Sequence, residues 1–367
     1  MTSMIPTALA MTLADGVSVC DRFGPGSRLR LHDEAAVFAP ADVTTPASSS
    51  LSPNAARNIL GQPIAFLAFG NQAAPPDLDA LAPIMDMVIA AQGGFMATSF
   101  ANPAYGRTVF QGHLFQHGQL VVNLVHALSE RLSGRVALIA HDVTAAGPAA
   151  IRARVTAARE QGVALALIDA ADLSPQATIR EAISAQPLIG GPAWLLPQTQ
   201  DTAISPGTVA AEKAAILSGA LDRQTLFQLG AAAAVLPLLR LDPAAPDALP
   251  AARLWAAAQT AQKIIISTSV PPDRLAPGVS GTALLAEIAA DLAAAGWRRF
   301  VLNGNDTASA ILARLGVTML DTGAPAAGLR WLHAKGYSFL PKPGGFGGRD
   351  LFLDGFEPHI RLNETAR

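Results

Sequence analysis

The stretch VLNGNDTASAILARLG at residues 301–316, followed by FLPKPGGFGGRD at residues 339–350, determines how this chain is interpreted. An apolar run, a short polar turn and an alanine-rich run predict a strand, a tight connection and a helix that begins near Ala308. The connection consists of Gly304, Asn305, Asp306 and Thr307. The N-terminal end of such a helix carries positive potential and favours anions.

The second stretch places one lysine beside a cluster of glycines. Lys342 precedes Gly344, Gly345, Phe346, Gly347 and Gly348. Glycines let backbone N–H groups approach a phosphate closely, and a lysine adds a point charge. The two stretches together predict a nucleotide-phosphate site made from two loops. Phe346 then either lies against the nucleotide or packs under the glycines.

Each stretch alone has a simpler interpretation. Asp306 or Thr307 near a helix start is typical of a helix cap, and a glycine-rich segment near a C-terminus is typical of a flexible loop. The chain contains neither the GxxxxGK[ST] pattern nor the GxGxxG pattern, so neither of those phosphate-binding mechanisms applies.

Short apolar runs alternate with alanine-rich runs from Val136 onward, which predicts an α/β fold with two domains, each a mostly parallel sheet flanked by helices. The expected strands are 136–139, 164–168, 193–196, 215–217, 238–241, 263–267 and 300–302. The expected helices are 148–161, 174–185, 223–233, 254–262, 282–295 and 308–315. The polar stretch 198–207 separates the two sets, so we expect domains at 1–200 and 205–367.

Composition narrows the classes of function. The chain has 367 residues, half of them hydrophobic, and a net charge of −2, which gives no reason to expect nucleic acid as a partner. Cys20 is the single cysteine, so a disulfide framework or a cysteine metal site is excluded. With no membrane-length apolar run and no basic start, we expect a cytoplasmic protein without a membrane partner. The sequence leaves oligomeric state open, and a homo-oligomer is among the arrangements it allows.

The motifs resemble those of the four-carbon acid sugar kinases. The run Gly304–Thr307, with Leu315-Gly316 after it, is similar to the family's GG(D/E)T…LG motif, and Lys342–Gly347 resembles its KSGNFG motif. The run Ile216–Gly219 resembles the LSGS segment that opens the nucleotide-binding domain. Gly106–Phe115, which contains Gly-Arg-Thr and Gly-His, is similar to a segment of the N-terminal domain.

The resemblance implies that domain 1–200 binds a small sugar acid and that domain 205–367 binds ATP with Mg²⁺, for transfer of the γ-phosphoryl group to a hydroxyl. It implies that Arg107 and His113 serve the sugar acid, and that Asp306 and Thr307 hold Mg²⁺ or orient phosphate oxygens. At the nucleotide it implies Ser218, Gly219, Gly304, Asn305, Asp306, Thr307, Lys342, Gly344, Gly345, Phe346 and Gly347. The general base is not identified.

Two family elements are not found in the sequence. The first is a strand running into an ADDxTGA loop: Thr7–Ala14 instead predicts the helix that should follow it, and Ala36–Phe38 the second strand. The second is the STFDST segment, replaced by Phe69–Ala74, which has neither acid nor hydroxyl. Three explanations stay open: a displaced start, a divergent kinase, or a degenerate member that binds a nucleotide or metabolite without phosphoryl transfer. We rank the kinase first.

Overall fold

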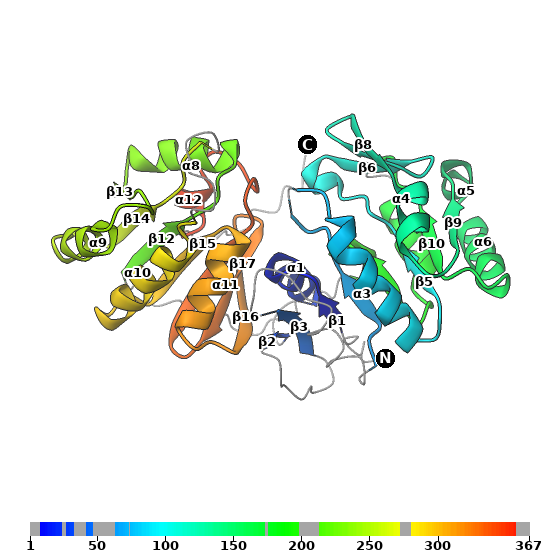
Figure 1. Ribbon diagram of the computed structural model, residues 1–367, viewed down its shortest axis with the longest axis horizontal. Coiled ribbons are helices and arrows are strands. Elements are labelled where there is room, and N and C mark those ends of the chain that lie inside the picture. The colour runs from blue at the N-terminus through cyan, green and yellow to red at the C-terminus, as the bar shows by residue number, and fades with distance from the viewer. Residues whose placement is uncertain are drawn as a thin grey trace, which may run out of the picture. The chain divides into compact units, whose positions relative to one another are not determined.

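The computed structural model describes residues 8–23, 27–32, 42–46, 63–72, 74–172, 175–197, 213–271 and 280–356. The chain forms two compact units, Met1–Asp201 (unit 1) and Thr202–Arg367 (unit 2). Each unit is an α/β structure built on a mostly parallel sheet (Figure 1), so the expected fold class is confirmed. No helix among the described residues is long and apolar enough to cross a membrane.

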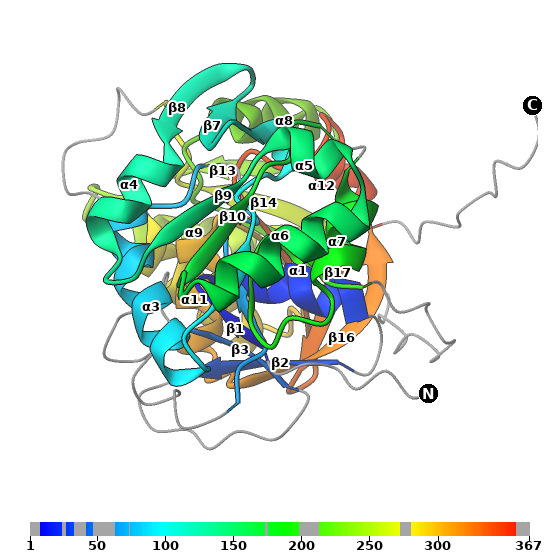
Figure 2. The same ribbon diagram turned by 90° about the vertical axis from the view of Figure 1, so that its right-hand side faces the viewer.

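Unit 1 contains a parallel sheet with the strand order β2-β3-β1-β4-β11-β5-β10-β9. These strands are β1 (Ala8–Ala10), β2 (Arg28–His32), β3 (Asp42–Pro46), β4 (Phe66–Ala68), β5 (Met96–Thr98), β9 (Val136–Ile139), β10 (Leu165–Ile168) and β11 (Ile189–Gly191). The helices are α1 (Leu13–Phe23), α3 (Leu78–Ala91), α4 (Leu124–Arg131), α5 (His141–Ala145), α6 (Pro148–Glu160) and α7 (Gln176–Ile183), with 3₁₀ helices η1 (Pro103–Tyr105) and η2 (Ala193–Leu195). Helix α6 packs on β9 and β10 beside α7 (Figure 2).

A separate antiparallel sheet of unit 1 was not anticipated from the sequence. It consists of β6 (Arg107–Phe110), β7 (His113–Gln116) and β8 (Gln119–Asn123), joined by tight turns. The first turn is tight because Gln111 and Gly112 both have positive φ values, 49° and 70°. This small sheet positions Arg107, the first residue of β6.

The start of unit 1 corrects one expectation. The sequence predicts a helix from Thr7 to Ala14, whereas Ala8–Ala10 form β1 and α1 begins at Leu13. β1 pairs in parallel with β3 and with β4, and all three of its residues are buried. Alanine favours a helix locally, but pairing on two sides and burial override that preference. The expected absence of a first strand is therefore wrong, while the strand predicted at Ala36–Phe38 lies outside the described residues.

Two further elements differ from the sequence prediction. Where a strand was expected at 193–196, residues 193–195 form η2, and the strand β11 comes earlier, with Gly190 packed closely against Met96. The helix expected at 254–262 is α9, Ala248–Ala257. Pro250 lies in its first turn, where a missing N–H costs no intrahelical hydrogen bond, so the proline does not delay the helix.

Unit 2 has the strand order β13-β14-β12-β15-β18-β17-β16. Its strands are β12 (Ala214–Ser218), β13 (Leu238–Arg240), β14 (Lys263–Ser267), β15 (Arg299–Asn303), β16 (Met319–Ala326), β17 (Leu329–Ala334) and β18 (Tyr337–Lys342). Its helices are α8 (Arg223–Ala233), α9 (Ala248–Ala257), α10 (Thr282–Ala294), α11 (Asn305–Arg314) and α12 (Leu351–Asp354). The pairings β16–β17 and β17–β18 are antiparallel, which returns β18 parallel to β15.

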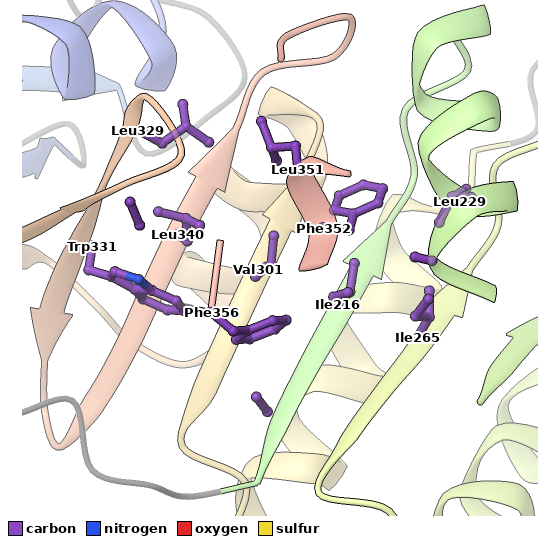
Figure 3. Close-up of a cluster of buried hydrophobic side chains, with 13 residues drawn as sticks. Ile216, Leu229, Ile265, Val301, Leu329, Trp331, Leu340, Leu351, Phe352 and Phe356 are labelled. Atoms are coloured by element: carbon purple, nitrogen blue, oxygen red, sulfur yellow. The ribbon is translucent and has the colours of Figure 1, made fainter. Parts of the chain in front are cut away.

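The core of unit 2 explains how the glycine-rich segment is held. Figure 3 shows side chains of β12, β14, β15 and β18 meeting those of α8 and α12, including Leu229 and Phe352. Phe346 packs against the same cluster. The segment between β18 and α12 is therefore anchored at both ends and by an aromatic side chain in its middle.

In each unit the chain leaves two neighbouring strands toward opposite sides of the sheet. In unit 1, β1 leads to β2 and β3 on one side, and β4 leads through α3 to β5 on the other. In unit 2, β12 leads through α8 to β13, and β15 leads through α11 to β16. In α/β proteins, such a point at the carboxyl ends of the strands is where ligands bind.

Candidate active site

Four polar side chains lie in one row at the carboxyl ends of the unit 2 strands. Ser218 is paired in register with Ser267 on one side and with Asn303 on the other, and Asn303 is paired with Lys342. All four are at most 1% exposed. The row includes both strands, β12 and β15, at which the chain direction reverses. The sequence-predicted residues Ser218 and Lys342 are thus brought together, with Asn303 between them.

Hydrogen bonds connect this row to the start of α8. Lys342 Nζ donates to Asn303 Oδ1 at 2.8 Å, and Asn303 Nδ2 donates to Ser218 Oγ at 2.7 Å and to Thr225 Oγ1 at 3.2 Å. Thr225 Oγ1 in turn donates to Asp222 Oδ2 at 2.8 Å. A buried lysine is therefore linked through an amide and a hydroxyl to a carboxylate.

Lys342 is a cation in an unusually apolar place. Its Nζ also donates to the Pro343 carbonyl at 3.2 Å and lies 5.5 Å from the centre of the Phe352 ring. Burial lowers the pKa of Lys342 from 10.5 to about 8, and the charge of Asp222 offsets part of that shift. An anion bound nearby would favour the charged form of Lys342, so a phosphate group would stabilise the protonated ammonium.

Glycines at this edge are required by space as well as by backbone angle. A Cβ at Gly219 would lie 2.3 Å from Thr307 Oγ1, and one at Gly344 would lie 2.8 Å from Asp222 Oδ2. Gly304 has φ +103°, which a residue with a side chain rarely adopts. The three glycines converge on the same loops, which agrees with a cradle into which backbone groups face.

Helix α11 begins earlier than the sequence suggests. Gly304 is its N-cap and supplies no side-chain cap, while Asp306 and Thr307 lie inside the first turn. Neither of them is the cap residue itself, but both lie next to it in the first turn, as the simpler interpretation expects. Asp306 is exposed and Thr307 is 2% exposed. The helix thus presents its N-terminal turn, with one exposed carboxylate, at the carboxyl edge of the sheet.

The glycine-rich segment is fixed by α8. Gln228 Nε2 donates to the carbonyls of Phe346, Gly347 and Gly348 at 2.9, 3.1 and 2.8 Å. Phe346 is half-buried and packs against the unit 2 core, so the structure favours the packing alternative for its ring. Exposed Asp350 is the N-cap residue of α12 and makes no side-chain cap.

A Mg²⁺ ion would have few protein ligands here. Within the described ranges, no group of three or more His, Cys, Asp or Glu side chains could hold a metal ion. Mg²⁺ in kinases usually takes one or two carboxylates, with phosphate oxygens and water completing its shell. Exposed Asp306 fits the role of such a single carboxylate ligand.

A second polar cluster lies in unit 1, beside β1 and β4, the two neighbouring strands that the chain leaves toward opposite sides of the sheet. Asp15, in the first turn of α1, accepts from the Asn71 backbone N–H at 2.8 Å, from Asn71 Nδ2 at 3.1 Å and from Thr12 Oγ1 at 2.7 Å. It is 1% exposed, and burial raises its pKa from 3.8 to about 6. The cluster joins the carboxyl ends of β1 and β4.

Arg107 is fully buried and holds the loop that follows β4. Its Nη1 donates to the Gly70 carbonyl at 3.0 Å, and its Nη2 donates to the carbonyls of Gln72 and Ala74 at 2.8 and 2.7 Å. Burial lowers the pKa of Arg107 to about 10. This geometry favours a positioning role over the direct contact with the sugar acid that the resemblance implies.

His113 is not brought next to Arg107. Arg107 pairs with Gln116, whereas His113 pairs with Phe110 at the other end of the β6–β7 hairpin, about 10 Å along the strand. His113 Nδ1 lies 2.8 Å from the Gln111 carbonyl. The two residues therefore serve different parts of unit 1.

Sequence reasoning missed several residues of the two clusters, among them Asp15, Asn71 and Asn303. Asn303 ends an apolar strand just before Gly304, and Asp15 follows a short apolar run and precedes Gly16. A polar residue that follows an apolar run and precedes a glycine is the signal that could have identified both. Asn71 lacked such a signal because its contacts are with residues 56 and 122 positions away.

Comparison with protein families separates the two units in the same way. Residues 74–196 match the model of a sugar-binding N-terminal domain, and residues 215–352 match that of a nucleotide-binding C-terminal domain. The second range contains the row from Ser218 to Lys342. The first matched range begins at Ala74, whose carbonyl accepts a hydrogen bond from Arg107.

Curated relatives of similar length carry one name. The chain is 31% identical to a 3-oxo-tetronate kinase of Cupriavidus necator over 75% of this chain and 74% of that protein. It is 31% identical to a 3-oxo-tetronate kinase of Methylobacterium radiotolerans over 75% of this chain and 76% of that protein.

Solved structures share the fold. The crystal structure of a Haemophilus influenzae protein matches 95% of this chain and 98% of its own with a TM-score of 0.69 at 20% identity. A structure from Salmonella typhimurium LT2 matches the same shares with a TM-score of 0.75 at 20% identity. Together, the motifs, the two domain matches and the kinase relatives show that the chain belongs to the four-carbon acid sugar kinase family, whose members are phosphotransferases.

Proposed function

We propose that this chain is an ATP-dependent kinase that phosphorylates a hydroxyl of a four-carbon sugar acid, with 3-oxo-tetronate as the first substrate to test. The observation that carries the proposal is the buried row Ser218–Asn303–Lys342 beside two glycines limited by space, Gly219 and Gly344, and one required by its backbone angle, Gly304, inside the range matched by the nucleotide-binding domain. Names of the relatives support the substrate class.

The proposed chemistry assigns each unit one task. Lys342 and the backbone near Gly344 would hold the phosphates of ATP, and Asp306 would be a ligand of Mg²⁺, which supplies charge neutralisation of the phosphates when bound. The hydroxyl oxygen of the acid forms a bond to the γ-phosphorus while the bond from that phosphorus to the β-phosphate oxygen breaks. ADP then leaves, and the hydroxyl proton passes to a base.

Asp15 is our candidate for that base. It is the carboxyl group of the unit 1 cluster, and its pKa of about 6 leaves it ionised at neutral pH yet basic enough to accept a proton. One of its oxygens, Oδ2, accepts a single hydrogen bond, from Thr12, and a carboxylate oxygen has two lone pairs. Asp15 thereby takes the role of general base, for which the sequence analysis identified no residue.

A coupled assay of ADP release over a panel of four-carbon acids tests the proposal. We expect turnover with at least one acid, a rate that rises with pH through about 6, and a loss of about 10²- to 10⁴-fold in Asp15→Asn. ATP binding without turnover on any acid would favour the binding-protein alternative. No binding of ATP would refute the nucleotide assignment itself.

A further inference from the structure

Asn303 has every polar atom of its side chain committed. Its Oδ1 accepts from Lys342 Nζ, and its Nδ2 donates to the hydroxyls of Ser218 and Thr225. Because the Lys342 ammonium can only donate, the amide has one favoured orientation, with its oxygen toward Lys342 and its nitrogen toward the two hydroxyls. Since these atoms already bind protein groups, we assign Asn303 a role that acts through its neighbours and not through contact with a ligand.

Asp222, which is linked to Asn303 through Thr225, also helps to fix the orientation of this amide. Thr225 Oγ1 donates to Asp222 Oδ2, and Asp222 Oδ1 accepts the Thr225 backbone N–H at 2.8 Å as the N-cap of α8. The Thr225 hydroxyl has therefore used its proton on Asp222 and can only accept from Asn303. The chain of hydrogen bonds runs in one direction, from Lys342 to Asp222.

Lys342 is left with capacity for a further acceptor. An ammonium has three N–H donors, and in the part of the chain that the structure describes its acceptors are Asn303 Oδ1 and the Pro343 carbonyl. Phe352 lies against it at 5.5 Å, and Asp222 is the charged group that acts on its pKa. A third N–H beside the glycine-rich segment suits a phosphate oxygen.

We propose that Asn303 is the positioning residue of Lys342, holding the ammonium by one N–H so that another is directed at a phosphate of the bound nucleotide. This inference rests on the proposed ATP-dependent function. Asn303 acts through Lys342 and not by contact with the nucleotide. Its effect should therefore be confined to ligands whose phosphates reach the lysine, and it should move the pH at which Lys342 loses its charge.

Calorimetric titration with ATP and with AMP between pH 7 and 9.5 tests the proposal in wild type, Asn303→Asp and Asn102→Asp. Asn303→Asp keeps the shape but places a carboxylate beside Lys342, which competes with phosphate and stabilises the charged lysine. We expect ATP affinity to fall about tenfold to a hundredfold and AMP affinity to change less than about twofold. Wild-type ATP affinity should decline as pH rises through about 8, and this decline should shift upward in Asn303→Asp.

Asn102→Asp is the matched control, since it makes the same change at a buried asparagine of unit 1, 5% exposed. It should lower stability and leave the binding of both nucleotides unchanged. Equal losses of ATP and AMP affinity in Asn303→Asp, with an unmoved pH dependence, would overturn the positioning role and leave a purely structural one. A wild type that binds neither nucleotide would refute the proposed function, and the inference with it.

Discussion

Arg107 and Asp15 bind the two ends of one peptide group. The carbonyl of Gly70 accepts from Arg107 Nη1 at 3.0 Å, and the N–H of Asn71, which belongs to the same peptide group, donates to Asp15 Oδ1 at 2.8 Å. A buried cation and a buried anion are thus joined through the peptide dipole, whose negative end faces the cation. The loop after β4 is held in place from both sides.

The first prediction concerns the cation of this arrangement. Arg107→Met should cost about 3–5 kcal/mol of unfolding free energy, because the Asp15 charge stays buried without the cation and three carbonyls each lose the donor that Arg107 supplies, although the Gly70 carbonyl keeps the Asn102 amide as a donor. Chemical denaturation of both proteins measures the loss. ATP binding should change little, since the residues proposed to hold ATP lie in unit 2.

Arg131→Met is the matched control. Arg131 pairs with Asp79 at 2.7 Å, but the two side chains are 33% and 80% exposed. A pair so exposed contributes below about 1 kcal/mol. If Arg107→Met were as mild as Arg131→Met but abolished binding of the sugar acid, Arg107 would contact the substrate directly, as the resemblance implies.

The second prediction concerns the pH dependence of stability. The pKa of Asp15 is raised from 3.8 to about 6 in the fold, so the folded state binds its proton more tightly than the unfolded state. This contribution to stability is complete below about pH 4 and is lost as pH rises through about 6. Asp15→Asn should retain the hydrogen bonds from Asn71 and can donate to Thr12, so it mimics the protonated form.

The unfolding free energy of Asp15→Asn relative to wild type should therefore rise between pH 4 and 6, by up to about 1.4 kcal/mol for each pH unit, and be level above that range. Denaturant titrations at half-unit intervals measure it. A difference that does not vary with pH would show that Asp15 titrates at its ordinary value and is ionised throughout.

In unit 2, β12 to β15 and the helices α8, α10 and α11 were predictable because each is a short apolar run or an amphipathic run between turn residues, whereas β16, β17, β18 and α12 were not predicted. Lys263–Ser267 and Arg223–Ala233 occur where the sequence indicates them. β1 was not predictable, because its three residues prefer a helix locally and become a strand only by pairing with β3 and β4. Local propensity says little about such a segment.

The candidate site was predictable to the same extent. Lys342 and Gly304 could be predicted as site residues from their residue type and their neighbours in the sequence. Asn303 does not, since its role depends on the register that places it between Ser218 and Lys342. Arg107 was identified by its motif, but the carbonyls that it binds come from a loop more than 30 residues away. Contacts of that range are set by topology and not by local pattern.

The third prediction concerns the space around Gly344. An alanine Cβ there would lie 2.8 Å from Asp222 Oδ2 and 3.4 Å from the Ala220 side chain. Either the loop or the Asp222 cap must then shift, at a cost of about 1–3 kcal/mol. We expect Gly344→Ala to weaken ATP binding and lower the melting temperature. Gly348→Ala, in the same segment with nothing within 4 Å of the added Cβ, should do neither.

A calorimetric ATP titration and a thermal melt of the two variants provide the comparison. The outcome against us is equal ATP affinity in Gly344→Ala and Gly348→Ala, which would place the nucleotide away from the start of this segment.

The last prediction concerns Gln228, which holds three consecutive carbonyls of the glycine-rich segment and is 0% exposed. Gln228→Met keeps the length of the side chain and removes the donor, so the carbonyls of Phe346 and Gly348 lose their partner on α8, while the Gly347 carbonyl keeps Gln224. A buried acceptor left without a donor costs about 1–3 kcal/mol. The Gln228 Oε1 is itself buried with no partner among the described residues, so its removal offsets part of that cost. The opening of the glycine-rich segment should therefore be a more sensitive measure of this substitution than the unfolding free energy of the whole protein.

Hydrogen exchange of the amides between Gly344 and Leu351 measures that opening, and ATP affinity measures its consequence. We expect faster exchange in this segment and weaker ATP binding in Gln228→Met. Gln224→Met is the control, because Gln224 also lies on α8 and donates to the Gly347 carbonyl at 2.8 Å, but from an exposed position where water can replace it. Similar exchange in both variants would mean that α8 does not hold the segment through Gln228, and that the Phe346 contact with the core and the two ends at β18 and α12 anchor it.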